Sequence, residues 1–114
     1  MTLKIGFITV DCDDTLRLAG FWSQALGYEN KGGDADWAEI GDPQRIHPPI
    51  LFQRVPETKA AKNRLHLDLN ADDMREEVGR LLNLGATRVH GYDESEQSVV
   101  MADPEGNEFC VAHW

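Results

Sequence analysis

Apolar and polar residues alternate at the start of the chain, and the pattern then changes to a helical period. Residues 3–12, LKIGFITVDC, alternate and are rich in β-branched and aromatic residues, which predicts a strand. Asp14 follows as a helix N-cap, and Gly27 ends the helix, because a glycine there takes the left-handed conformation without steric cost. The apolar positions of the helix are Leu16, Ala19, Trp22, Ala25 and Leu26. Three short strands are predicted next, around Tyr28, at 36–40 (DWAEI) and at 49–55 (PILFQRV).

The second half of the chain repeats this order of elements. Residues 65–71, LHLDLNA, predict a strand, and Asp73 with Glu76 resembles a capping box at the start of a helix. The apolar stripe of that helix is Met74, Val78, Leu81 and Leu82, and Gly85 ends it. Further strands are predicted at 86–90 (ATRVH), 97–102 (QSVVMA) and 107–113 (NEFCVAH).

The landmarks of the two halves recur at a nearly constant offset of about 58 to 61 residues. The matching pairs are Asp14 and Asp73, Gly27 and Gly85, and Asp42-Pro43 and Asp103-Pro104. Coincidence among short helix and turn signals is the alternative to an internal duplication. We predict an α+β fold in which one domain, residues 1–114, consists of two βαβββ modules at about 1–56 and 63–114.

Composition excludes several classes of partner. Hydrophobic and charged contents of 41% and 27% are typical of a globular protein. A net charge of −9 argues against nucleic acid or an anionic membrane as partner. Cys12 and Cys110 are too few for a disulfide scaffold and lie in apolar strand patterns, which favours buried thiols. There is no apolar run of membrane-spanning length and no signal-peptide pattern at the start, so we expect a soluble, cytoplasmic protein.

Several motifs together resemble one known superfamily. They are D-x-x-x-x-x-x-F-W from Asp14, ALGY from Ala25, LFQRVPE from Leu51, KNRLHLDL from Lys62 and DPEGNEF from Asp103. The chain resembles the glyoxalase/bleomycin-resistance/dioxygenase superfamily, also called vicinal oxygen chelate proteins, and especially its short glyoxalase-like members. The resemblance implies two modules whose curved, mixed sheets enclose a cavity, and usually a homodimer. The fold hosts isomerases, dioxygenases, lyases and drug-binding proteins, so function must be argued from the site.

The resemblance also implies where metal-dependent members hold their ion, on the first and fourth strands of each module. Counting seven residues back from Asp73 gives His66, and from Asp14 it gives Phe7. On the fourth strands the positions are interpreted as Glu108 and Leu51, with Gln53 two residues after Leu51. Only His66 and Glu108 keep strong ligand chemistry, whereas a stable site generally needs three protein ligands. We therefore expect no cofactor. The alternative is a divalent metal held by His66, Glu108 and Gln53.

Alternation along the strands predicts which side chains line the cavity. The residues assigned to ligand binding are Phe7, Thr9, Trp37, Leu51, Gln53 and Asp68. Asp11, Glu39, Asn70, Cys110 and Ala112 are predicted to share the same faces. His66 and Glu108 are expected to hydrogen-bond, each stabilising the other's charged form, as a ligand anchor or an acid–base pair. A structural His–Glu pair remains an alternative, and Trp37 is either a core residue or a stacking wall.

The preferred hypothesis is a small-molecule-binding protein with a degenerate metal site, which binds or sequesters a partly aromatic metabolite or drug. The alternative is an enzyme, either a metal-dependent lyase, isomerase or dioxygenase, or a metal-free acid–base catalyst using His66 and Glu108. Residues 54–64, RVPETKAAKNR, are interpreted as a solvated linker, or alternatively as a basic lip of Lys59, Lys62 and Arg64. The aromatic end at Trp114 favours a homodimer, because an exposed apolar terminus is a liability on a monomer.

Overall fold

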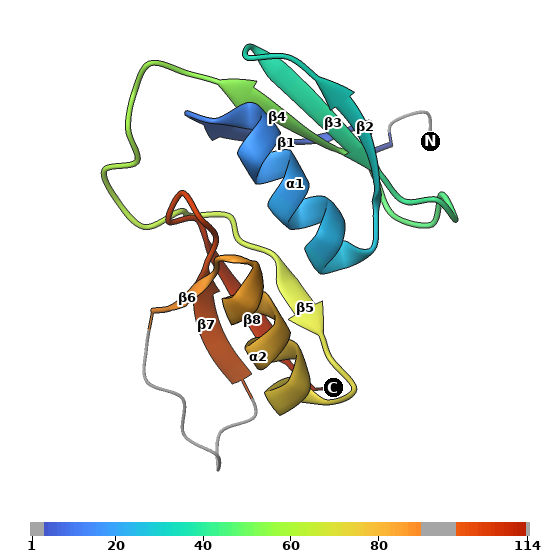
Figure 1. The fold of residues 1–114 in the computed structure, drawn as a ribbon, viewed down its shortest axis with the longest axis vertical. Coiled ribbons are helices and arrows are strands. Elements are labelled where there is room, and N and C mark those ends of the chain that lie inside the picture. Colours follow the sequence, from blue (N-terminus) through green and yellow to red (C-terminus); the bar gives the residue numbers. More distant parts are fainter. Residues whose placement is uncertain (1–3, 90–97, 114) are drawn as a thin grey trace. The chain divides into compact units, whose positions relative to one another are not determined.

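The computed structural model describes residues 4–89 and 98–113, so His90 and Trp114 lie outside the described residues. The chain divides into two compact units, residues 1–58 and 59–114. Figure 1 shows that each unit contains a sheet with one helix packed on it. Among the described residues, no helix has the length and apolar character needed to span a membrane.

The first unit forms a mixed four-stranded sheet with the order β1-β4-β3-β2. Its elements are β1 (Ile8–Cys12), α1 (Thr15–Leu26), β2 (Glu29–Gly33), β3 (Trp37–Gly41) and β4 (Ile50–Arg54). Strand β1 runs parallel to β4, whereas β3 is antiparallel to both β4 and β2. A parallel pair requires a crossover, and α1 with the β2–β3 hairpin provides it.

The second unit repeats this topology with the order β5-β8-β7-β6. Its elements are β5 (Asp68–Asn70), α2 (Met74–Leu84), β6 (Thr87–Arg88), β7 (Ser98–Ala102) and β8 (Glu108–Ala112). Strand β5 is parallel to β8, and the other described pairs are antiparallel. The predicted α+β fold of two βαβββ modules is confirmed, although β5 is shorter than the strand predicted at 65–71.

The helix boundaries follow from the local sequence as predicted. The Asp14 carboxylate accepts a hydrogen bond from Arg17 N at 3.1 Å, and that of Asp73 accepts one from Glu76 N at 3.1 Å. Each helix ends at a left-handed glycine, Gly27 or Gly85. These cap signals act within a few residues of the helix ends. They determine the boundaries because each cap forms hydrogen bonds with backbone groups that the helix itself leaves unpaired.

Each helix covers one face of the sheet in its own unit (Figure 1). Helix α1 buries Leu18, Ala19, Phe21 and Trp22, and the buried strand residues of the same unit include Ala38, Ile40, Ile50 and Phe52. Phe21 and Trp22 contact each other edge to face, with ring centroids 5.2 Å apart, and both belong to the core of this unit. The second core contains Val78, Leu81, Val99, Met101, Phe109 and Val111. The opposite face of each sheet is left open by the described elements of its own unit.

The turn between β2 and β3 has a backbone that only glycine permits at one position. A Cβ on Gly33 would lie 2.1 Å from the carbonyl oxygen of Trp37, which no side chain could tolerate. The Asp34 carboxylate accepts hydrogen bonds from Asp36 N at 2.8 Å and Trp37 N at 3.2 Å. This tight turn therefore fixes where Trp37 enters β3.

Candidate functional site

Two rows of side chains cross the open face of the first sheet. The strand register aligns Thr9, Leu51 and Glu39 in one row, and Asp11, Gln53 and Trp37 in the next. Residues directly opposite each other on neighbouring strands point to the same face. The structure thus brings Thr9, Leu51, Gln53 and Trp37 together on one face, in the arrangement that the alternation predicted.

Two aromatic side chains of this unit are exposed. Trp37 is 48% exposed and Phe7, just before β1, is 51% exposed, whereas Trp22 is only 4% exposed. The interpretation of Trp37 as a core residue is therefore wrong within its own unit. A half-exposed indole on a sheet face can stack on a planar molecule.

The polar side chains on this face differ in what they already contact. Glu39 forms an ion pair with Lys31 at 3.7 Å. Within the described part of the chain, the side chains of Asp11, Gln53 and Trp37 make no hydrogen bond or ion pair with protein. The row that contains them therefore has a carboxylate, an amide and an indole N–H free to bind a ligand.

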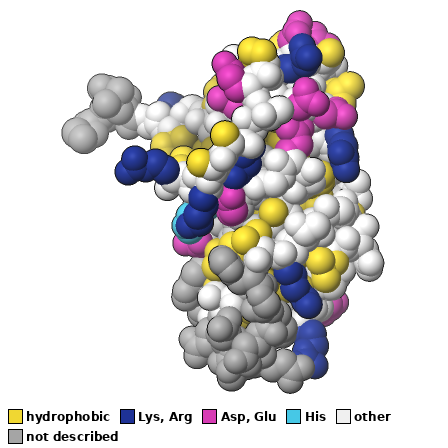
Figure 2. Space-filling view, turned by 90° about the vertical axis from the view of Figure 1, so that its left-hand side faces the viewer, with side chains coloured by type: hydrophobic (Ala, Val, Ile, Leu, Met, Phe, Trp, Pro, Cys, Tyr) yellow, Lys and Arg dark blue, Asp and Glu magenta, His cyan; other side chains and the backbone are white. Residues whose placement is uncertain are grey.

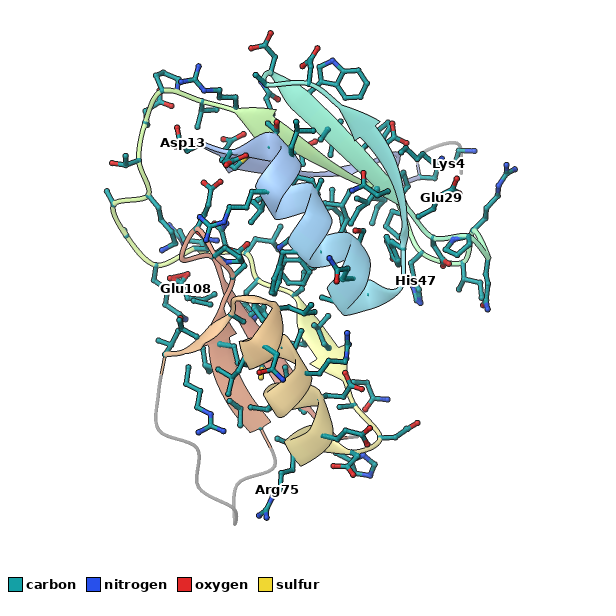
Figure 3. All side chains as sticks on the ribbon, in the orientation of Figure 1. Lys4, Asp13, Glu29, His47, Arg75 and Glu108 are labelled. Carbon is teal, nitrogen blue, oxygen red and sulfur yellow. The ribbon has the colours of Figure 1, made fainter. Side chains whose placement is uncertain are left out.

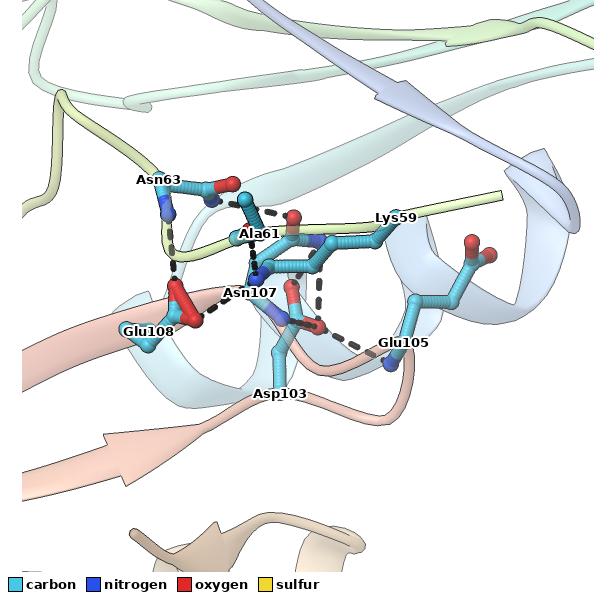
Figure 4. A network of polar contacts seen from close by, with 7 residues as sticks. All are labelled: Lys59, Ala61, Asn63, Asp103, Glu105, Asn107 and Glu108. Atoms are coloured by element: carbon cyan, nitrogen blue, oxygen red, sulfur yellow. Dashed lines mark hydrogen bonds and ion pairs between the residues drawn. The ribbon is translucent and has the colours of Figure 1, made fainter. Parts of the chain in front are cut away.

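In the second unit, Glu108, which is labelled in Figure 3, is held by the segment that leads into β5 (Figure 4). Lys59 Nζ donates a hydrogen bond to Glu108 Oε1 at 2.6 Å, and Asn63 N donates to Oε2 at 3.0 Å. Lys59 Nζ also donates to the carbonyl of Ala61. The hydrogen bond from Lys59, followed by that from Asn63, lowers the pKa of Glu108 from 4.5 to about 2. Glu108 is therefore a charged, fully engaged carboxylate.

A second layer of contacts supports this arrangement (Figure 4). Asn63 Nδ2 donates to Asn107 Oδ1 at 3.1 Å, and Asn107 Nδ2 in turn donates to the Asp103 carboxylate. Asp103 is only 3% exposed and also accepts from Glu105 N at 2.9 Å and Asn107 N at 3.0 Å. The segment from Lys59 to Asn63 is thus fastened to the turn that precedes β8. We call this set of contacts the connector latch.

The latch corrects two predictions about the segment between the modules. Residues 59–63 are not simply a solvated linker, because Lys59 and Asn63 both bind Glu108. Lys59 is also unavailable for a basic lip, since its ammonium group already has a carboxylate and a carbonyl as acceptors. No sequence motif marks this pairing. Its only signal is a lysine and an asparagine in a polar segment that is otherwise unexplained.

His66 has a different partner from the one expected. Its Nδ1 lies 3.1 Å from Asp68 Oδ1, and both side chains are about half exposed, at 41% and 51%. The bond from Cys110 N to Leu67 O extends the β5–β8 register, which places His66 opposite Glu108 on the neighbouring strand. The predicted direct hydrogen bond between them is nevertheless absent among the described contacts. Lys59 and Asn63 already occupy both oxygens of Glu108.

The two sheets also show which residues of the modules are equivalent. Thr9 and Asp68 each lie five residues before the N-cap aspartate of their helix (14 − 9 and 73 − 68). Thr9 pairs with Leu51, and Asp68 pairs with Cys110. Leu51 is therefore equivalent to Cys110 and not, as the sequence interpretation had it, to Glu108. The counterpart of Glu108 is Pro49, two residues before Leu51.

Cys110 shares its row on the open face of the second sheet with Asp68 and Val100. Burial raises the pKa of the Cys110 thiol, and the Asp68 carboxylate raises it further. Cys110 is partly buried and Cys12 is buried. The predicted burial is therefore confirmed for Cys12 and holds only in part for Cys110.

These side chains do not fit a divalent metal ion. The sequence interpretation assigned Phe7 and Leu51 to the metal positions of the first module, and the register replaces Leu51 by Pro49. None of these three has a side-chain donor. In the second module the ammonium group of Lys59 lies 2.6 Å from Glu108 and would repel a cation there. Among the described residues there is also no cluster of three His, Cys, Asp or Glu side chains suited to metal binding.

Comparisons with known proteins place the chain among others of this architecture. A family model described as "Glyoxalase-like domain" matches residues 7–112. No curated protein matches the sequence. A solved glyoxalase/bleomycin resistance protein/dioxygenase family enzyme from Burkholderia phytofirmans PsJN has a TM-score of 0.75 and 17% identity, over 95% of this chain and 96% of that one.

Two further solved structures have the same fold. The bleomycin-binding protein from Streptomyces verticillus, complexed with copper(II)-bleomycin, has a TM-score of 0.65 and 18% identity, over 100% of this chain and 99% of that one. A fosfomycin resistance protein from Listeria monocytogenes has a TM-score of 0.75 and 13% identity, over 100% of this chain and 93% of that one. At such low identity the likeness shows the fold alone.

Proposed function

Because the chain belongs to the glyoxalase-like domain family, we propose that it is a small-molecule-binding member that holds its ligand without a metal ion. The ligand is a partly aromatic metabolite or drug, which the protein binds or sequesters. The observation that carries this proposal is the half-exposed Trp37 in one row with Gln53 and Asp11. An aromatic wall beside a few polar groups is the usual composition of a small-molecule site.

The apolar members of the same face add to this argument. Phe7 and Pro49 lie at the first-module positions that the resemblance and the strand register assign to metal ligands, and Leu51 follows two residues after Pro49. All three offer only apolar surface. Replacing donors by such side chains converts a coordination site into a surface for hydrophobic contact. A neighbour of the same fold is described as a bleomycin-binding protein, so binding is a function that this fold can serve.

An enzyme that needs no metal is the second candidate, and one observation favours it. Asp68 lies 3.1 Å from Nδ1 of His66, an arrangement that orients an imidazole and leaves Nε2 for a substrate. His66 would then act as a general base in a lyase or isomerase reaction. Glu108 has no part in this alternative, because its oxygens are engaged by the connector latch.

Thermal unfolding in the presence of small molecules tests the proposal. The protein is first dialysed against EDTA and then unfolded with metal-free bleomycin, fosfomycin and a panel of planar aromatic compounds. We expect at least one compound to raise the Tm equally in EDTA-treated and untreated protein. Trp37→Leu should remove that shift, whereas Ile46→Ala, which trims an exposed apolar side chain elsewhere in the same unit, should keep it. A shift that returns only after Zn²⁺ or Mn²⁺ is added would contradict the proposal.

A further inference from the structure

We infer that the row of Asp11, Gln53 and Trp37 selects a planar ligand that carries a positive charge, such as a protonated nitrogen heterocycle. This inference rests on the proposed binding function and specifies its ligand class. The three residues come from β1, β4 and β3, which are consecutive in the sheet. Asp11 pairs with Gln53, and Gln53 pairs with Trp37.

The dimensions of the row suit a ligand of two or three fused rings. Neighbouring strands are about 4.8 Å apart, so the backbone positions of Asp11 and Trp37 are separated by about 10 Å. A ring system stacked on Trp37 can therefore extend past Gln53 toward Asp11. The Gln53 amide can accept a hydrogen bond from a ring N–H or donate one to a ring nitrogen.

The charges on this face favour a cation. Asp11 is exposed and has no ion-pair partner among the described residues, whereas Glu39 is already paired with Lys31. Neither of the two rows contains a lysine or arginine. An anionic ligand would thus meet an uncompensated carboxylate, while a cation would gain attraction from it.

Two further features also favour a cationic ligand. The indole face of Trp37 attracts a cation through its quadrupole, an effect that adds to stacking. Acidic side chains also gather on the surface of the first unit in Figure 2, and the chain as a whole has a net charge of −9. Such a field raises the local concentration of cationic molecules at low salt.

Three probes of the same ring system and different charge test the inference. They are 9-aminoacridine, a cation at neutral pH, acridine, which is neutral, and acridine-9-carboxylate, an anion. Each is titrated by fluorescence at about 50 mM and about 500 mM salt. We expect 9-aminoacridine to bind about fivefold or more tightly than acridine and the carboxylate to bind most weakly, with smaller differences at high salt.

Variants show which residue produces the preference. Asp11→Asn should reduce the difference between 9-aminoacridine and acridine to about twofold or less, and Asp11→Glu should retain it. Trp37→Leu should weaken all three probes. Glu76→Gln removes the same charge from an exposed position on α2 in the other unit and should leave the preference unchanged.

The possible failures are distinguishable. If acridine binds as tightly as 9-aminoacridine, and Trp37→Leu still weakens it, the charge selectivity is wrong while the proposed binding function stands. If Asp11→Asn leaves the preference intact, the role of Asp11 is wrong. If none of the three probes binds, the inference is overturned. The thermal screen with the wider panel then decides the binding function separately.

Discussion

Arg45 and Gly106 occupy the same position of a turn that the chain contains twice, and both have a positive φ, 56° and 86°. In each copy the backbone N–H donates to the carbonyl of the aspartate three residues earlier, at 2.9 Å: Arg45 to Asp42 and Gly106 to Asp103. Glycine adopts this left-handed conformation without steric cost, whereas arginine does not. The first copy of the turn is therefore strained where the second is relaxed.

Substitution at these two positions should change stability in opposite directions. Gly106→Ala should lower the free energy of unfolding by about 1 kcal/mol, because alanine is strained at this φ while its Cβ would make only an ordinary 3.8 Å contact with Lys59. Arg45→Gly should raise it by up to about 1 kcal/mol. Urea denaturation measures both. Gly79→Ala, at an open position in α2, should instead stabilise the protein, and a neutral Gly106→Ala would contradict the prediction.

Lys59→Met should open the connector latch without removing packed core atoms. Glu108 would keep only the Asn63 N–H as a donor from that segment, so residues 59–63 would lose their main attachment to β8. We expect a loss of about 1–3 kcal/mol in stability and about fivefold or more faster trypsin cleavage after Lys62 and Arg64. Lys31→Met, which breaks the exposed pair with Glu39, is the control. Equal cleavage rates in the two variants would show that the latch does not hold the segment.

Acid should weaken the protein partly through Glu108. Folding lowers the pKa of Glu108 from 4.5 to about 2, so the unfolded state binds more protons between these values. The contribution of Glu108 is complete above about pH 4.5 and is lost as the pH falls toward 2. Glu108→Gln should be less stable near neutral pH and should lose less stability on acidification. Urea denaturation at several pH values tests this, with Glu57→Gln as the control, which should retain the wild-type slope.

Calorimetric titration with Zn²⁺, Ni²⁺, Mn²⁺ and Fe²⁺ should show no submicromolar, one-to-one binding. Phe7 and Leu51 supply no lone pairs, and the Lys59 ammonium competes with any cation for Glu108. Tight binding that disappears in His66→Ala would overturn this expectation and would make Gln53 the next candidate ligand. Lys59→Met offers a further comparison, because removing the ammonium group should only strengthen residual binding.

We expect the protein to form a homodimer, as the resemblance to two-module superfamily members implies. The apolar residue that motivated this expectation, Trp114, lies outside the described residues. Light scattering at micromolar concentration tests it, and a monomeric mass would count strongly against it. Trp114→Ser should then shift the mass toward the monomer if the terminus contributes to the interface.

Much of the fold could be predicted because its signals are local. Asp14 and Gly27 mark the ends of α1 through contacts within a few residues, and strand alternation assigned Trp37 and Gln53 to one face. The fourth strands were misaligned because the pair Leu51-Phe52 was matched to Glu108-Phe109 by residue type. The register instead makes Leu51 equivalent to Cys110, and the segment before the strand is two residues longer in the first module (51 − 42 = 9 against 110 − 103 = 7).

The connector latch could not be predicted because nothing local encodes it. Lys59 and Glu108 are 49 residues apart, and a flexible lysine in a polar segment has many candidate acceptors. The expected His66–Glu108 contact was inferred from the ligand positions that the resemblance implies and from strand alternation. The observed register does set the backbones of these two residues side by side. Strand register fixes the backbone positions, but it does not determine which donor forms a hydrogen bond with a long, flexible side chain. His66 instead contacts Asp68, which is only two residues away along the chain. Glu108 instead contacts Lys59, whose ammonium group forms a charge-assisted hydrogen bond with the carboxylate.

The glycine at position 33 has a consequence for how new specificities could arise. Its backbone approaches that of Trp37 so closely that every other amino acid is excluded, and mutation can hardly change the shape of this turn. The open face can therefore vary mainly in the side chains at positions 11, 37 and 53. All three are exposed, so replacing one of them does not require the strands to move. A lineage of this protein could exchange one ligand for another by single substitutions while its scaffold remained constant, and saturation libraries at those three positions are the economical place to search.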